Sequence, residues 1–167
     1  MVDLKLFPST QPGVKDMNDT SLAEALESCF PQMNDGAVLL WNGVSVPLSY
    51  KFDLGIIIHD IIFLVQQLRT CSMGSFTICW PSNSFRVDWQ VAVAAGRVQV
   101  TALWESVYAP VDALNASPVV EADQVGFMAQ WLALLRFANQ ALLDTGYTAG
   151  ELDDYVLLVE ELAHHRQ

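Results

Sequence analysis

Hydrophobic and polar positions alternate most regularly in residues 85–93, FRVDWQVAV. Five apolar side chains fall on every second position of this segment: Phe85, Val87, Trp89, Val91 and Val93. This is the period of a strand with one buried face. Residues 75–80 and 98–106 are also rich in β-branched and aromatic residues. We therefore predict a three-stranded antiparallel meander.

A turn at residues 94–97 would fix the register of the last two of these strands. On the core side it sets large side chains against smaller ones, with Trp89 opposite Ala102 and Val87 opposite Trp104. On the other face the register gives three pairs: Arg86 with Glu105, Asp88 with Leu103, and Gln90 with Thr101. This face is either a solvated sheet surface or a recognition surface. Leu103 beside Asp88 favours contact with a partner.

Residues 37–48, AVLLWNGVSVPL, predict a hairpin because Asn42 and Gly43 separate two apolar runs. Pro47 has no N–H to give to a ladder, so the second strand is expected at a sheet edge.

Apolar periodicity and capping residues indicate about four helices. The first is expected at residues 22–30, after a Ser21–Glu24 capping box, and the second at 53–69, with Asp53 as its N-cap. The third is expected at 120–145, ended by Gly146, and the fourth at 149–164, after a second capping box at Thr148 and Glu151. The element order predicts one α+β domain over residues 1–167. Its antiparallel sheet would combine the N-terminal hairpin and the meander, with the helices mainly on one face.

The charge balance limits the classes of molecule that this chain can bind. Of 167 residues, 52% are hydrophobic and 16% are charged, as in a globular chain, and the net charge is -11. Residues 105–167 hold ten carboxylates and two arginines, a net -8, whereas residues 1–104 hold nine carboxylates and six basic residues, a net -3. Nucleic acid requires a basic surface, so the acidic chain favours a basic protein partner instead.

Cysteine use and hydropathy predict a cytoplasmic protein without a membrane partner. The three cysteines have no CxxC spacing, which argues against a disulfide framework and a zinc site. Residues 1–9 lack the features of a secretory signal, and the apolar run at 54–65 is interrupted by His59 and Asp60 and is too short to span a bilayer.

One candidate contact site lies on the predicted helix at 53–69. Phe63 is ringed by polar residues at helical spacing: His59, Asp60, Gln66 and Gln67. Ile56 lies on the same stripe. An exposed apolar group among polar ones is typical of a contact site, although another element of the chain could equally cover it.

The last predicted helix shows a similar pattern. Its expected core stripe is Leu152, Tyr155, Val156, Val159 and Leu162. Leu157 points away from that stripe, among four carboxylates: Asp153, Asp154, Glu160 and Glu161. This patch suits a partner that offers Arg or Lys around an apolar socket, and a solvated acidic face is the alternative.

No complete catalytic or cofactor motif is present, and we predict neither catalytic residues nor a cofactor. His164 and His165 follow Glu160 and Glu161 by four residues, a spacing that could hold a metal, but histidines also suit the C-terminal end of a helix. A small hydrolase or metal-dependent enzyme is therefore the third-ranked alternative.

Two segments, AVLLWNGVSVPLSYKFDLGIIIHDIIFLV and FMAQWLALLRFANQALLDTGY, resemble the small acidic immunity proteins encoded beside bacterial polymorphic or contact-dependent toxins. The resemblance implies a cytoplasmic inhibitor that binds its cognate toxin domain stoichiometrically and carries no catalytic residues. An adaptor or secretion chaperone that binds an apolar client segment is the second hypothesis.

Overall fold

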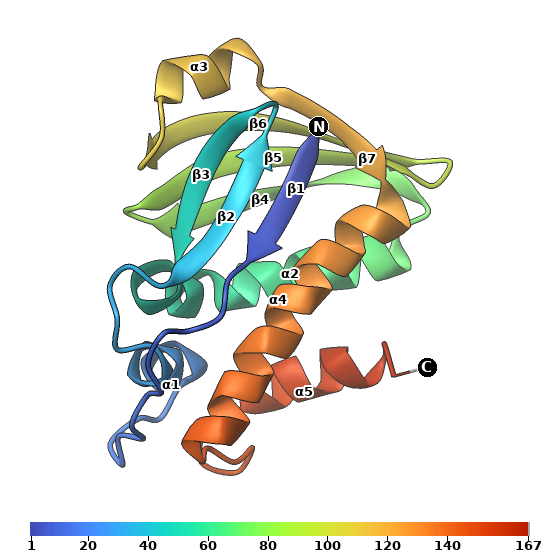
Figure 1. The fold of residues 1–167 in the computed structure, drawn as a ribbon. Coiled ribbons are helices and arrows are strands. Elements are labelled where there is room, and N and C mark those ends of the chain that lie inside the picture. Colours follow the sequence, from blue (N-terminus) through green and yellow to red (C-terminus); the bar gives the residue numbers. More distant parts are fainter. Residues whose placement is uncertain (167) are drawn as a thin grey trace.

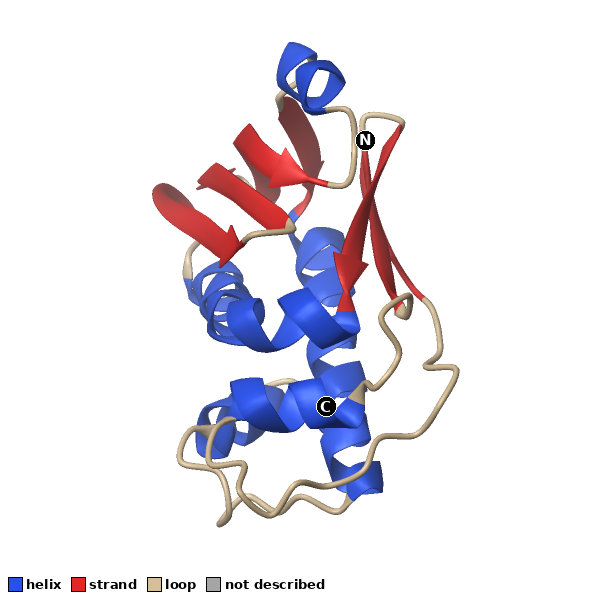
Figure 2. Ribbon diagram, turned by 90° about the vertical axis from the view of Figure 1, so that its left-hand side faces the viewer, coloured by secondary structure: helices blue, strands red, loops and turns tan. Residues whose placement is uncertain are grey.

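Two antiparallel sheets face each other above a group of helices in the computed structural model, which describes residues 1–166 (Figure 1, Figure 2). The first sheet has the order β1 (Val2–Leu6), β2 (Gly36–Trp41), β3 (Val44–Ser49). The second has the order β4 (Met73–Ser82), β5 (Phe85–Ala94), β6 (Arg97–Val107), β7 (Val119–Asp123). The α+β class is confirmed, but the hairpin and the meander belong to separate sheets, so the single predicted sheet is wrong.

Five α-helices complete the described chain: α1 (Leu22–Cys29), α2 (Gly55–Thr70), α3 (Val111–Ala116), α4 (Gln124–Thr145) and α5 (Tyr155–Ala163). A turn of π-helix, η1 (Tyr50–Leu54), leads directly into α2. The helices α1, α2, α4 and α5 lie together below the sheets, and α3 lies at the opposite end (Figure 2). No helix within residues 1–166 combines the length and the apolarity needed to cross a bilayer.

Two strands escaped prediction because each is short and lies beside a stronger signal. β1 buries Val2 and Leu4 against β2, and β7 pairs with β6 over residues that the sequence suggested as the start of a helix. That helix, α4, begins only after Asp123, whose carboxylate accepts a hydrogen bond from the Gly126 N–H at 2.7 Å. Gly146 ends it in a left-handed conformation, as expected.

Two of the three hairpin turns, between β2 and β3 and between β5 and β6, have two central residues with positive φ. The angles are 47° at Asn42 and 88° at Gly43, and 50° at Ala95 and 74° at Gly96. Positive φ at both central positions matches the twist of the flanking strands. The expected hairpin and the turn at 94–97 are thus confirmed.

The predicted register of β5 and β6 is confirmed at Trp89–Ala102, Val87–Trp104, Asp88–Leu103 and Gln90–Thr101. It is wrong at Arg86, which lies opposite Ser106 and not Glu105. An irregularity between Arg86 and Val87 inserts one residue into the pairing, as a β-bulge does.

β3 is an edge strand, as Pro47 predicted, and its outer backbone offers few donors. In a two-residue hairpin the residues flanking the turn form a hydrogen-bonded pair, so the N–H groups of alternate residues 45, 47 and 49 point outward. Pro47 has none, and the Ser49 N–H donates to Asp53 at 2.7 Å. This edge is therefore protected against the addition of another strand.

All five tryptophans meet in the core between the sheets. Trp41 of the first sheet lies 5.5 Å from Trp89 and 5.2 Å from Trp104 of the second, between ring centroids. Trp131 of α4 lies 5.2 Å from Trp80 and 5.6 Å from Trp89. The indole N–H groups of Trp80, Trp89, Trp104 and Trp131 are buried without a conventional partner. Several ring pairs meet nearly edge to face, which brings positive ring edges toward aromatic faces.

The structure also corrects some of the predicted helix starts. The Ser21–Glu24 capping box of α1 is confirmed. Ser49, not Asp53, caps the η1–α2 segment, while Thr148 and Glu151 bond to each other as expected without starting a helix there. The chain continues through turns until α5 begins at Tyr155. The predicted core stripe is wrong at Val156, which is 46% exposed, and Leu158 is buried in the core instead.

Asn42 links the two sheets and supplies the first testable prediction. Its side chain donates to the carbonyls of Ser117 and Val119, each at 2.9 Å, and accepts from the N-terminal amino group at 2.7 Å. Asn42→Gly keeps the positive φ but removes these bonds, so we expect a loss of about 2 kcal/mol in the free energy of unfolding, measured in urea.

The matched control is Ala95→Gly in the two-residue turn between β5 and β6. Its side chain makes no hydrogen bond, and glycine relieves the positive φ, so the change should stay within about 0.5 kcal/mol. Equal effects of the two substitutions would show that Asn42 acts only through its turn conformation.

Candidate functional site

Two side-chain contacts hold α2 and α5 side by side. His59 Nε2 lies 2.7 Å from Asp154 Oδ2, just before the start of α5, and near the C-terminal ends Arg69 binds Glu161 with two contacts of 3.0 Å. The helices therefore run in the same direction, and α4 packs against both. In Figure 1, α4 crosses in front of α2 and α5.

This arrangement joins two patches that the sequence suggested separately. On α5, Leu157 is one turn from both Asp154 and Glu161, so it borders the seam with α2. Leu157 is 42% exposed, and Phe63 of α2 is 40% exposed although its ring meets the edge of Phe76 at 6.1 Å. Neither side chain is sealed inside the fold. We name the combined patch the α2–α5 surface, and it comprises His59, Asp60, Phe63, Asp153, Leu157 and Glu160.

Two of the four carboxylates predicted around Leu157 already have partners within the chain. The side chain of Glu161 is 1% exposed and accepts hydrogen bonds from Arg69 and from His165 at 3.0 Å. Asp154 is half-buried and accepts from the Leu22 N–H at 2.7 Å as well as from His59. The prediction that Glu161 lies on the exposed face is wrong, because Arg69 reaches it from α2. Asp153 and Glu160 remain exposed.

The electrostatics of Glu161 reflect this burial. Desolvation raises the pKa of its carboxyl group, but hydrogen bonds and charges from Arg69 and His165 outweigh that effect and hold the pKa below its ordinary value of 4.5. Glu161 is therefore ionised at neutral pH and serves to anchor α5.

The outer face of the four-stranded sheet continues the acidic surface. Leu103 is 59% exposed opposite Asp88, which also pairs with Cys79 on β4. A hydrogen bond to Asp88, burial and the nearby charges of Asp88, Asp60 and Glu105 raise the pKa of the exposed Cys79 thiol. Asp60 of α2 thus lies within electrostatic range of the sheet face. Its own pKa is raised by burial.

Ile56 lies apart from Leu157, at a groove that the sequence did not reveal. The groove has a volume of about 1040 Å³ and is lined by residues of five segments: 7–10, 33–38, 47–56, 82–84 and Tyr108. They include parts of β2, β3 and η1 and the turn between β4 and β5. Phe7, Met33, Phe52 and Tyr108 contribute exposed apolar side chains to it. These residues are far apart in sequence and share no periodicity, so no local pattern could have grouped them. We name this cavity the β3 groove.

Two of the four residues considered for metal binding bond to each other, whereas Glu160 and His164 are exposed. His165 contacts Glu161, and no group of three metal-ligating side chains suited to a metal ion occurs within the described chain, residues 1–166. Comparisons with protein-family models, curated proteins and solved structures find no match for this sequence. A functional proposal therefore depends on the surfaces described above.

The pair formed by the buried Glu161 and the exposed Arg69 supplies the second prediction. Glu161→Gln should lower the free energy of unfolding by about 2 kcal/mol at pH 7, because a charged hydrogen-bonded group is lost. The folded-state pKa is lowered, so this stabilisation is present above pH 4.5 and is lost as the pH falls through the folded pKa. Urea unfolding at pH 7 and at pH 3 measures the difference.

Glu160→Gln is the matched control, since the neighbouring carboxylate is exposed. It should change stability by less than about 0.5 kcal/mol at either pH. If the two variants lose equal stability, Glu161 does not anchor α5.

Proposed function

We propose that this protein is an immunity-type inhibitor that binds a basic toxin domain stoichiometrically through the α2–α5 surface. The observation that carries the proposal is the exposure of Phe63 and Leu157 on two helices joined by the His59–Asp154 contact, with Asp153 and Glu160 beside them. Apolar anchors surrounded by polar groups are the usual composition of a protein-binding site.

The charge distribution supports a basic partner. Residues 105–167 carry a net charge of -8, and the surface extends toward further carboxylates on the sheet face, Asp88 and Glu105. A surface with one predominant sign of charge accelerates association with an oppositely charged partner. Cytoplasmic inhibitors that must capture a toxin before it acts benefit from such rapid association.

An inhibitor of this kind acts by occlusion and needs no reacting group of its own. The polar groups at the α2–α5 seam serve to position the helices: His59 with Asp154, and Arg69 with Glu161. The toxin would be neutralised because its active site or an essential surface is covered while the complex persists.

The third prediction tests whether the exposed carboxylates contact the partner, as distinct from those that bond within the chain. Asp153→Lys with Glu160→Lys should weaken binding of the toxin encoded by the neighbouring gene about tenfold at 50 mM salt, with most of the change in the association rate. At 500 mM salt the difference should shrink, because exposed charges are screened. Surface plasmon resonance with purified proteins measures both rates.

A control variant with the same change in net charge is Glu27→Lys with Asp112→Lys, on α1 and α3. Both residues are exposed and outside the α2–α5 surface. An equal loss of affinity in the control would mean that only the total charge matters. Unchanged affinity in the Asp153 and Glu160 variant would remove α5 from the interface.

A second function is favoured by the exposed apolar side chains themselves. An adaptor or secretion chaperone that binds an apolar client segment would use Phe63 and Ile56 more than the carboxylates. In that case Phe63→Ser should weaken binding at least tenfold at every salt concentration, while Asp153→Lys has little effect. A salt titration of complex formation therefore distinguishes the two functions: a steep dependence supports the inhibitor, and a flat one supports the adaptor.

A further inference from the structure

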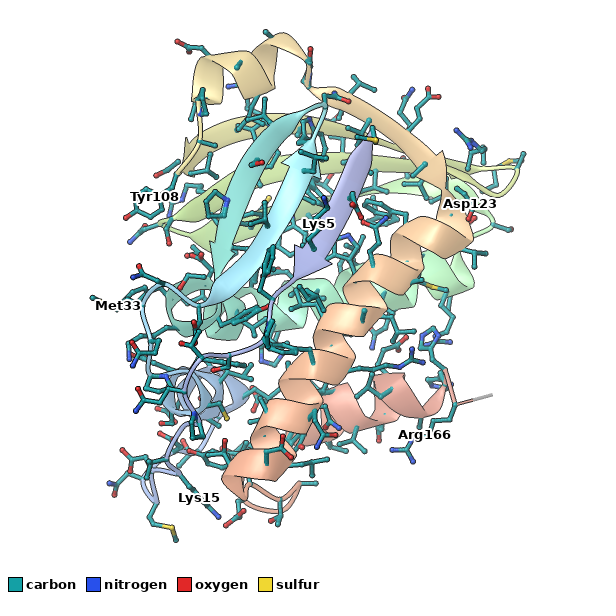
Figure 3. All side chains as sticks on the ribbon, in the orientation of Figure 1. Lys5, Lys15, Met33, Tyr108, Asp123 and Arg166 are labelled. Carbon is teal, nitrogen blue, oxygen red and sulfur yellow. The ribbon has the colours of Figure 1, made fainter. Side chains whose placement is uncertain are left out.

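The β3 groove gathers an unusual share of the exposed apolar side chains. Within residues 1–166, sixteen large hydrophobic side chains are exposed, and five of them line this groove: Phe7, Met33, Phe52, Ile56 and Tyr108. Figure 3 shows Met33 and Tyr108 projecting at the same edge of the molecule. A volume of about 1040 Å³ is at the upper end of the range for sites that bind small molecules or side chains.

The polar part of the groove carries negative charge only. Asp35 and Asp53 line it, both nearly buried, and no Lys, Arg or His side chain does. Asp35 accepts from the Thr10 N–H and from the hydroxyls of Ser9 and Thr10. Asp53 accepts from the Ser49 N–H and from the hydroxyls of Ser82 and Ser84.

These donors are all neutral, so they satisfy the carboxylates without cancelling their charge. Neither aspartate takes part in any of the four ion pairs formed within the described chain. The Thr10 N–H is the main cause that holds the pKa of Asp35 below its ordinary value. The groove therefore combines an apolar rim with uncompensated negative charge in its lining, where a cation is favoured.

The edge of the groove excludes one common mode of peptide binding. Addition of a strand to β3 needs free outward N–H groups, and Pro47 lacks one while Ser49 donates its own to Asp53. Of the three outward positions only Ser45 keeps an available N–H, so a continuous ladder cannot form along this edge and an occupant inserts side chains instead.

We infer that the β3 groove binds a protein segment that presents a lysine or arginine flanked by apolar side chains. The aliphatic stem of such a residue packs on apolar surface while its charged end approaches the carboxylates. The exposed rings of Phe7 and Tyr108 offer further favourable contacts to a cation, whereas the Phe52 ring already has Lys51 Nζ 6.0 Å from its centroid. The inference does not depend on the inhibitor function, because the groove is separate from Leu157 and the α5 carboxylates.

The test uses three short peptides that differ in one property each. The probe is acetyl-Leu-Arg-Leu-Lys-Leu-amide, the charge control is acetyl-Leu-Glu-Leu-Glu-Leu-amide, and the apolarity control is acetyl-Ser-Arg-Ser-Lys-Ser-amide. Each is titrated into the isotope-labelled full chain and followed by NMR at 50 mM salt. We expect the probe to bind at least tenfold more tightly than either control, with the largest shift changes at Met33, Phe52, Ile56 and Tyr108.

Matched variants establish the location. Phe52→Ser and Tyr108→Ser, each made singly, should weaken probe binding at least fivefold, whereas Val125→Ser and Leu143→Ser, which change equally exposed residues of α4, should leave it unchanged. Thermal unfolding of each variant verifies the fold. Because two groove variants are used, loss of one through misfolding still leaves a test.

Three outcomes would overturn the inference. Equal binding of the acidic peptide would show that the groove recognises apolar groups alone, and equal binding of the serine peptide would show recognition of charge alone. Shift changes confined to α2 and α5 would place the peptide on the α2–α5 surface. That last result would support the proposed function while it disproves a site in the groove, so the two can fail independently.

Discussion

The contact of Trp41 with Trp89 and Trp104 is the interaction on which the arrangement of this protein depends. It is the aromatic contact that joins the first sheet to the second, and each tryptophan buries on the order of 200 Å². Polar cross-links secure the two ends of this apolar core. Asn42 connects the first hairpin to Ser117 and to the start of β7, and Asp53 connects η1 to the end of β4 and the turn that follows it. The β3 groove opens beside the second of these links, so the same contacts that join the sheets also shape the cavity.

The carboxylates of this chain serve two different purposes, and only their surroundings separate them. Asp53 and Glu161 are buried, and donors from distant parts of the chain satisfy them. Asp153 and Glu160 have no such burial and project from the same region of the fold. A net charge of -11 therefore overstates the charge available to a partner. Charge reversal at Asp154 or Glu161 would report on the seam between α2 and α5 more than on binding.

Local sequence patterns predicted most of the helices and strands. They could not predict contacts between residues that are distant in the sequence. Asn42 and Gly43 specify their hairpin through positive φ, and alternation around Trp89 specifies the register of β5 and β6 because one face is buried. Nothing local says that the hairpin and the meander form two sheets, since that depends on contacts across tens of residues. The same limit applies to the site: the exposure of Phe63 and Leu157 follows from helical periodicity, but the burial of Glu161 requires Arg69, 92 residues away. The β3 groove is the extreme case, because its lining comes from five separate segments between Phe7 and Tyr108.

The shortness of α5 explains why the seam with α2 matters for any function of this surface. A helix of nine residues is marginal in isolation, so its position comes from tertiary contacts. Leu158 and Leu162 bury one side of it, while Asp154 and Glu161 tie it to α2 at both ends. Leu157 is thereby held at a fixed place beside α2, before any partner arrives. A surface ordered in advance loses less conformational entropy on binding, so more of the contact energy appears as affinity. These contacts need not contribute much net stability to have this effect, because what they supply is a fixed orientation of the exposed apolar groups.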